Sequence, residues 1–212
     1  MTPTHITAND PICQALARAL KQQGSSHRLA SLERLKDKGL AHDHVRLVGT
    51  GILARIPKQS QMQLSALDNL AYQSACFTRA SITGYAPGLM GQLMPCDDLP
   101  RGALLVEEIV GRNAALPGDL KAIVQSLAAM HAMVLPPVAA RAPLRNAPDP
   151  LVDLLAEVEA QARHFSASDA APSSIAMVLA ELERFKQLCA RSQRPAQCLI
   201  AFDGHPGNFV VQ

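Results

Sequence analysis

The hydrophobic pattern of the chain changes character at Gly111, and this change limits the fold more than any other feature. Before Gly111, short β-branched or apolar runs recur, which is typical of strands. After Gly111, apolar residues recur at helical spacing through three longer segments. The sequence therefore predicts a small sheet followed by a mainly helical part.

The first part of the chain predicts strands and helices together. Gly49-Thr50-Gly51 is a turn between two strand-like runs, which predicts a β-hairpin. Asp10 followed by Pro11 is typical of a helix N-terminus. The predicted strands cover residues 45–48, 52–56, 89–94 and 103–110. The predicted helices cover residues 10–23, 31–38 (closed by Gly39) and 62–79.

The second part predicts three amphipathic helices and then a terminal hairpin. The helices cover residues 117–131, 151–165 and 175–190, and the final strands cover residues 197–202 and 208–211. The predicted fold class is α+β in two lobes. Residues 1–108 would form an N-lobe with an antiparallel sheet, and residues 109–212 a mostly helical C-lobe.

Composition indicates a chain with a packed core. Of its 212 residues, 48% are hydrophobic and 18% are charged, and the net charge is only +2, which argues against disorder. The chain has no basic run, and aromatic residues amount to 3% with no Trp. A nucleic-acid partner is therefore not expected.

The cysteines and the N-terminus indicate a cytoplasmic protein. The five cysteines are scattered and never spaced as C-x-x-C, so neither a disulfide framework nor a structural zinc site is expected. Met1 to Asn9 lacks the pattern of a signal peptide. No apolar stretch reaches the length of a membrane span, so no membrane partner is expected.

The segment from Asp203 to Asn208 carries the chemistry. Apolar residues flank a loop that begins with a carboxylate and ends, five residues later, with a carboxamide. Phosphoryl transfer uses such a pair, because a carboxylate accepts the proton of the attacking hydroxyl and a carboxamide oxygen binds Mg²⁺ on the phosphates. The alternative is an ordinary turn, since Asp-Gly and Pro-Gly are common turn dipeptides.

This loop resembles the catalytic loop of the aminoglycoside phosphotransferase and choline kinase superfamily, where H-G-D-x-H-P-G-N is typical. Three further segments are similar to that superfamily in order and spacing. They are the strand and hinge of residues 104–112, the helix of residues 116–133 and the basic-residue strand of residues 53–57. The resemblance implies a protein-kinase-like fold and an ATP-dependent, Mg²⁺-dependent transfer of phosphate to a hydroxyl of a small molecule.

The resemblance also implies roles for individual residues. Asp203 matches the catalytic aspartate and Asn208 the metal-binding asparagine. Arg55 lies where the family has a Lys or Arg directed at the nucleotide phosphates. The backbone of Glu107, Glu108 and Ile109 would face the adenine, and Gly49 and Gly51 loosely match the turn over the phosphates.

Three features depart from the family pattern. Ala201 stands where the family has a histidine that braces the loop. Asp68 is the acidic residue nearest to the place of the usual partner of the strand Lys or Arg. The chain ends at Gln212, before the family's second metal-binding aspartate, so it is expected to be truncated at the C-terminus. Loss of such an electrostatic element lowers rates by about a hundredfold or more, and near-inactivity of this chain is expected.

Two rival interpretations remain open. The chain could be an inactive kinase-like fragment or pseudoenzyme that binds nucleotide weakly at most. It could also be an unrelated helical binding module, in which case Asp203 and Asn208 would lie far apart. His42-Asp43-His44 is expected to be a solvated loop, since a structural zinc site needs more ligands than this segment offers. His131 is expected to be a structural histidine on its helix face, and His205 to hold the shape of the loop that contains it.

Overall fold

The computed structural model describes residues 10–36, 41–60, 62–194, 196–200 and 203–212. The chain forms two compact units. The first contains residues 1–134 together with 199–212, and the second contains residues 135–198. The expected lobe boundary between residues 108 and 109 lies within the first unit and stays a prediction.

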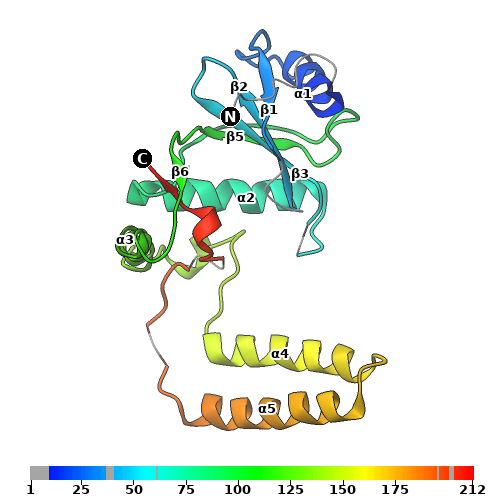
Figure 1. Ribbon diagram of the computed structural model, residues 1–212, viewed down its shortest axis with the longest axis vertical. Helices are drawn as coiled ribbons and strands as arrows, with labels where there is room; N and C mark the ends of the chain where they lie inside the picture. Colours follow the sequence, from blue (N-terminus) through cyan, green and yellow to red (C-terminus); the bar gives the residue numbers. More distant parts are fainter. Residues whose placement is uncertain (1–9, 37–40, 61, 195, 201–202) are drawn as a thin grey trace. The chain divides into compact units, whose positions relative to one another are not determined.

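The first unit is built on an antiparallel sheet in which β5 lies between β3 and β4 (Figure 1). Its five strands lie in the order β1-β2-β3-β5-β4, and every neighbouring pair is antiparallel. The strands are β1 (Leu32–Arg34), β2 (His42–Leu47), β3 (Ile52–Pro57), β4 (Leu89–Leu93) and β5 (Ala103–Glu107). The α+β class is therefore confirmed for the described residues.

The β2–β3 hairpin follows the predicted pattern. Gly49 and Gly51 have φ angles of 77° and 69°, in the left-handed region that glycine adopts without steric cost. Between them, the Thr50 hydroxyl donates to the Leu47 carbonyl at 2.7 Å and closes the turn. The predicted hairpin and the predicted strand at residues 89–94 are confirmed, and the strand predicted over residues 103–110 is confirmed as far as Glu107, where β5 ends.

Helix α1 (Pro11–Gln22) covers one face of the sheet. Its apolar residues recur at helical spacing, and Leu16 and Leu20 are fully buried against Val45, Leu47 and other core residues of the strands. Asp10 caps the helix, because its Oδ1 accepts from the N–H groups of Ile12 and Cys13 at 2.9 and 3.1 Å.

Arg34 of β1 links α1 to the sheet. Its guanidinium lies 3.1 Å from Asp10 Oδ2 and 2.6 Å from Asp43 Oδ1 on β2. Both aspartates are buried, since only 8% of the surface of Asp10 and 7% of that of Asp43 is exposed. A buried carboxylate needs a cation or several hydrogen-bond donors, and Arg34 supplies both through one side chain.

Helix α2 (Ala66–Ala80) covers the opposite face. Leu70 packs with Leu104 and Val106 of β5 in a second buried cluster, to which Phe77 and Leu53 add. The helix starts at a capping interaction, since the backbone N–H of Asp68 donates to the Ser65 hydroxyl at 3.1 Å. The prediction of a helix over residues 62–79 is confirmed, with its start four residues later.

The predicted helix over residues 31–38 is wrong. Leu32–Arg34 is strand β1, with Glu33 opposite Arg46 of β2, while Lys38 and Gly39 lie outside the described residues. Leu32 and Leu35 fit helical spacing, but pairing with β2 satisfies the backbone there and brings Glu33 within 2.8 Å of Arg46. Tertiary pairing thus overrides a short periodic signal.

After β5, the chain forms β6 (Arg112–Asn113) and α3 (Leu120–His131), which confirms the helix predicted over residues 117–131. Strand β7 (Val210–Val211) pairs with β6, with Arg112 opposite Val211. The predicted strand over residues 197–202 is wrong for residues 197–200, which are irregular, and Ala201 and Phe202 lie outside the described residues. The terminal hairpin is therefore replaced by a pairing with the segment after β5.

The second unit is a helical hairpin. Helices α4 (Pro150–Ser166) and α5 (Pro172–Arg191) pack against each other, and both predicted helices are confirmed. Asp149 caps α4 and pairs with Arg194 at 2.7 Å beyond the end of α5, so the two ends of the hairpin are tied. Among the described helices, none combines the length and hydrophobicity needed to cross a membrane.

The Asp10–Arg34 contact predicts a pH-dependent stability. Burial opposes ionisation of Asp10, but the Cys13 N–H and the Arg34 guanidinium outweigh it and hold the pKa of Asp10 below its ordinary value of 3.8. A carboxyl whose folded pKa is depressed stabilises the fold above its unfolded pKa and loses this effect as pH falls through the folded pKa. The free energy of unfolding should therefore fall as pH drops below about 4.

Asp10→Asn separates this contribution from that of other acids. The amide retains the helix cap but loses the ion pair, so we expect a loss of about 1–2 kcal/mol at neutral pH. Urea unfolding should also show a shallower dependence on pH below about 4 in the variant than in the wild type. Parallel pH curves for the two proteins would contradict the assignment.

Candidate functional site

The loop from Asp203 to Asn208 is held by bonds within itself. The Asn208 carboxamide Nδ2 donates to the Asp203 carbonyl at 3.2 Å, so the two ends of the loop are tied together. The short 3-10 turn Pro206–Asn208 closes the loop, with the Asn208 N–H donating to the His205 carbonyl at 2.9 Å. The carboxamide oxygen is the atom of Asn208 that could bind a cation, because the amide NH2 group acts only as a hydrogen-bond donor.

The His205 ring braces the same loop. Its Nδ1 accepts from the Gly207 N–H at 3.1 Å, which caps the 3-10 turn. A neutral imidazole that accepts at Nδ1 carries its proton on Nε2, so the contact selects one tautomer. His205 therefore has a structural contact here, in agreement with the expectation that this residue holds the loop's shape.

The loop is anchored to the segment that follows β5. The Ala114 N–H donates to the Phe209 carbonyl at 3.0 Å, next to the β6–β7 pair. Gly111 makes this approach possible, because an added Cβ would lie 2.8 Å from Val210 Cγ1 and closer still to the Val211 carbonyl oxygen. On the other side, Gly204 faces Leu127 of α3.

An ion pair fixes the turn between β6 and α3. Both Nη atoms of the Arg112 guanidinium donate to the Asp119 carboxylate, at 2.5 and 2.8 Å, and the Ala115 N–H donates to it at 2.7 Å. The hydrogen bonds from Arg112 and from this N–H lower the pKa of Asp119 to about 2. Asp119 is therefore ionised at neutral pH and keeps the loop's neighbouring segment in place.

This geometry brings Asp203 and Asn208 together in one exposed loop. A carboxylate that is open to solvent can accept a proton from a hydroxyl, and a carboxamide oxygen is a suitable Mg²⁺ ligand. The donor set thus fits Mg²⁺ in its oxygen chemistry. Among the described residues, no group of three or more His, Cys, Asp and Glu could hold a metal ion by itself.

Arg55 lies on β3 and faces α2. Its guanidinium carbon is 4.9 Å from the centre of the Phe77 ring, and its Nε is buried without a hydrogen-bond partner among the described residues. Burial lowers the pKa of the guanidinium from its usual value, although the group stays charged at neutral pH. Ser65 is the N-cap of α2, and its hydroxyl donates to the Asp68 carboxylate at 2.6 Å, while no ion pair between Asp68 and Arg55 is found among the described residues.

The residues expected near the adenine lie at the end of β5. The N–H groups of Glu107 and Glu108 donate to the carbonyls of Gly88 and Gly51, both within 2.9 Å. The turn that contains Gly49 is therefore joined to this hinge segment, at the β5 end of the sheet. Of the three expected hinge residues, Ile109 is the one whose N–H has no acceptor in the described part of the chain.

One guanidinium, that of Arg46, pairs with the carboxylates of both Glu108 and Glu33. Glu108 accepts from Arg46 Nε at 2.6 Å, and the same guanidinium contacts Glu33 at 2.8 Å. Sequence patterns do not indicate this cluster, because Glu33 falls in the segment that has helical spacing. Phe77 was not indicated either, since an aromatic residue on the apolar face of a helix is expected to be core.

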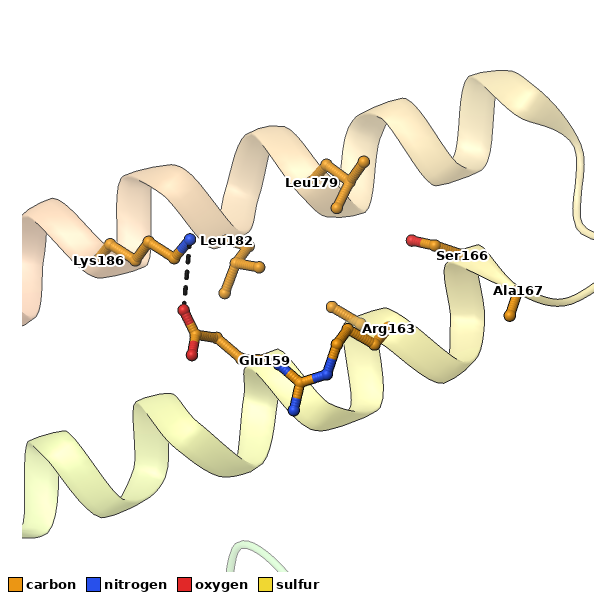
Figure 2. A pocket seen from close by; sticks show the side chains of 8 residues that line it. Glu159, Arg163, Ser166, Ala167, Leu179, Leu182 and Lys186 are labelled. Atoms are coloured by element: carbon orange, nitrogen blue, oxygen red, sulfur yellow. Dashed lines mark ion pairs between the residues drawn. The ribbon is translucent and has the colours of Figure 1, made fainter.

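A pocket of the second unit lies between α4 and α5 (Figure 2). It has a volume of about 540 Å³ and is lined by apolar side chains and by Glu159, which pairs with Lys186 at 3.3 Å. Ser166 and Arg163 also line it. It contains none of the predicted site residues, and its groups are those of a helix–helix contact.

Comparison with known proteins shows the fold. No protein-family model matches the sequence, and no curated protein matches it at a significant level. Among solved structures, the chain is similar to a choline/ethanolamine kinase family protein from Mesorhizobium loti, with a TM-score of 0.56 and 16% identity. The match covers 88% of this chain and 56% of that protein, so the chain spans little more than half the neighbour's length. The fold is therefore kinase-like.

The close approach at Gly111 predicts that a methyl group there disturbs the loop. Gly111→Ala would force β6 and β7 apart, and overpacking of this kind costs about 1–3 kcal/mol. Hydrogen exchange should become faster at the Ala114 N–H and along β7. Gly118→Ala is the control, because a Cβ there meets only an ordinary contact at 3.9 Å. Equal exchange rates in the two variants would contradict the prediction.

Proposed function

We propose that the protein containing this chain is an ATP-dependent phosphotransferase that phosphorylates a hydroxyl group of a small molecule. The observation that supports this most is the loop that ties Asn208 to Asp203 and is anchored beside the segment after β5. The kinase-like fold adds support, since it is shared with a choline/ethanolamine kinase family protein.

In this proposal, each residue has a separate task. Asp203 orients the acceptor hydroxyl and accepts its proton as the bond to phosphorus forms. Asn208 would hold Mg²⁺ through its carboxamide oxygen, and the metal would neutralise charge on the phosphates. Arg55 contacts the phosphates from β3.

The hinge segment would hold the base of the nucleotide. Ile109 offers its backbone N–H, while Glu107 and Glu108 use theirs to fix the segment against Gly88 and Gly51. The Gly49–Gly51 turn stays a candidate for nucleotide contact through its position beside this segment. ATP and Mg²⁺ are thus the proposed cofactors.

The proposed acceptor is a small alcohol, and nucleic acid is not a proposed partner, since the chain has no basic run. The name of the structural neighbour suggests amino alcohols such as choline and ethanolamine as the first acceptors to test. A cytoplasmic location is proposed from the scattered cysteines. A non-catalytic role is not favoured, because the solved structure with a similar fold is a choline/ethanolamine kinase family protein.

Replacement of Asp203 tests the proposal. In the protein that contains this chain, Asp203→Asn should lower kcat by about a hundredfold to ten-thousandfold, because the amide cannot accept the proton. ATP consumption with a panel of hydroxyl compounds gives the readout. The fold should be unaffected, since Asp203 is exposed.

Asp97→Asn provides the matched control. Asp97 is also an exposed aspartate, but it lies in the connection between β4 and β5. Its replacement should leave kcat and thermal unfolding unchanged. If wild-type turnover persists in Asp203→Asn, the catalytic role of Asp203 is wrong.

A further inference from the structure

Arg55 is a charged side chain in apolar surroundings. The alternation along β3 directs it to the same face as Leu53, which packs against the second buried cluster of the sheet and α2. Its Nε is shielded from solvent and finds no partner among the residues that the structure describes. The residue as a whole stays partly exposed, so hydration is lost at Nε, and this side of the guanidinium has to be held by something other than water.

Helix α2 does not supply a carboxylate to this guanidinium. Its sheet-facing side presents Leu70, Gln73 and Phe77, which share one face because they are three, four and seven residues apart. Gln73 is already used, since its Oε1 lies 3.2 Å from the ring Nε2 of His42. The acid of the first turn, Asp68, belongs to the cap.

Phe77 takes the place next to Arg55. The guanidinium carbon lies 4.9 Å from the ring centre, within the range in which the negative face of an aromatic ring attracts a cation. This attraction grows when the cation is desolvated, as it is here. A ring differs from a carboxylate in one respect, because it holds the cation without cancelling its charge.

The neighbouring His42 shows the effect of this uncancelled charge. Burial lowers the pKa of His42, and the positive charge of Arg55 lowers it further. The imidazole is therefore kept neutral beside the guanidinium at neutral pH. Arg55 and, to a smaller extent, Lys58 supply the positive charge that acts on His42.

We propose that Phe77 is a positioning residue, which holds Arg55 over its ring so that the guanidinium offers its full charge to the polyphosphate of the nucleotide. This inference rests on the proposed function, because it assigns the nucleotide's phosphates to Arg55. It adds a residue and a mode of contact, in which an aromatic ring does the work that an acidic residue would otherwise do.

The test compares three ligands by calorimetry on the whole chain. ATP contains the base and the phosphates, inorganic tripolyphosphate contains the phosphates alone, and adenosine contains the base alone. In Phe77→Leu, we expect the dissociation constants of ATP and tripolyphosphate to rise about tenfold, while that of adenosine stays unchanged. Phe77→Tyr keeps the aromatic face and should bind all three ligands as the wild type does.

A double-mutant cycle separates positioning from packing. Arg55→Met removes the charge and keeps an apolar side chain of similar length, so it should weaken ATP and tripolyphosphate binding on its own. In this background, Phe77→Leu should cause no further loss, because the ring then has no cation to hold. An equal further loss in both backgrounds would show that Phe77 acts only through packing, and would overturn the inference.

Fluorinated phenylalanines at position 77 keep the experiment decisive if Phe77→Leu does not fold. Fluorine withdraws charge from the ring face with little change of shape, so each added fluorine should weaken tripolyphosphate binding step by step. Thermal unfolding of each variant monitors the fold. Binding that is insensitive to fluorination would overturn the inference.

Failure of the inference and failure of the proposed function give different results. A wild-type protein that binds ATP, together with a Phe77→Leu variant that binds it equally well, contradicts the role of Phe77 alone. A wild-type protein that binds neither ATP nor tripolyphosphate contradicts the proposed function, and the inference with it.

Discussion

Strand β3 pairs with β2 on one side and with β5 on the other, and this pairing decides which side chains face which layer. With Ile52 opposite Glu107 and Arg55 opposite Leu104, Ala54 points into the core under α1 and Arg55 points towards α2. A shift of one residue would place the guanidinium in the core under α1. An unpaired charge in such a core costs several kcal/mol, so the register is strongly specified.

The parts of the fold that could be predicted are those with a long local signal. Helices α1, α2, α4 and α5 have apolar residues at helical spacing over three turns or more, and long periodic segments of this kind are the most predictable from sequence. Strand β1 has three residues, and its identity depends on pairing with β2 rather than on its own pattern. Strands β6 and β7 have two residues each, too few to show a period.

In the candidate site too, local features could be predicted from the sequence and long-range contacts could not. The proximity of Asp203 and Asn208 could be predicted, because the hydrogen bond between them closes within one short loop, while their roles stay a prediction. The anchor of this loop could not be predicted, because it joins Phe209 to Ala114 across almost a hundred residues. The role of Gly111 could not be predicted from the sequence either, since this role is to leave space for β7.

The contact between Arg55 and Phe77 explains why the fold can lack an acidic partner at this place. A partly exposed ion pair adds about 0–1 kcal/mol to stability, and a cation over an aromatic ring adds a similar amount. Exchange of one for the other is therefore nearly neutral for folding. The two arrangements differ in charge, because an ion pair is neutral and an arginine over a ring remains a cation. Replacement of a carboxylate by an aromatic ring beside Arg55 therefore changes stability little, but it leaves a net positive charge that would attract an anionic ligand more strongly.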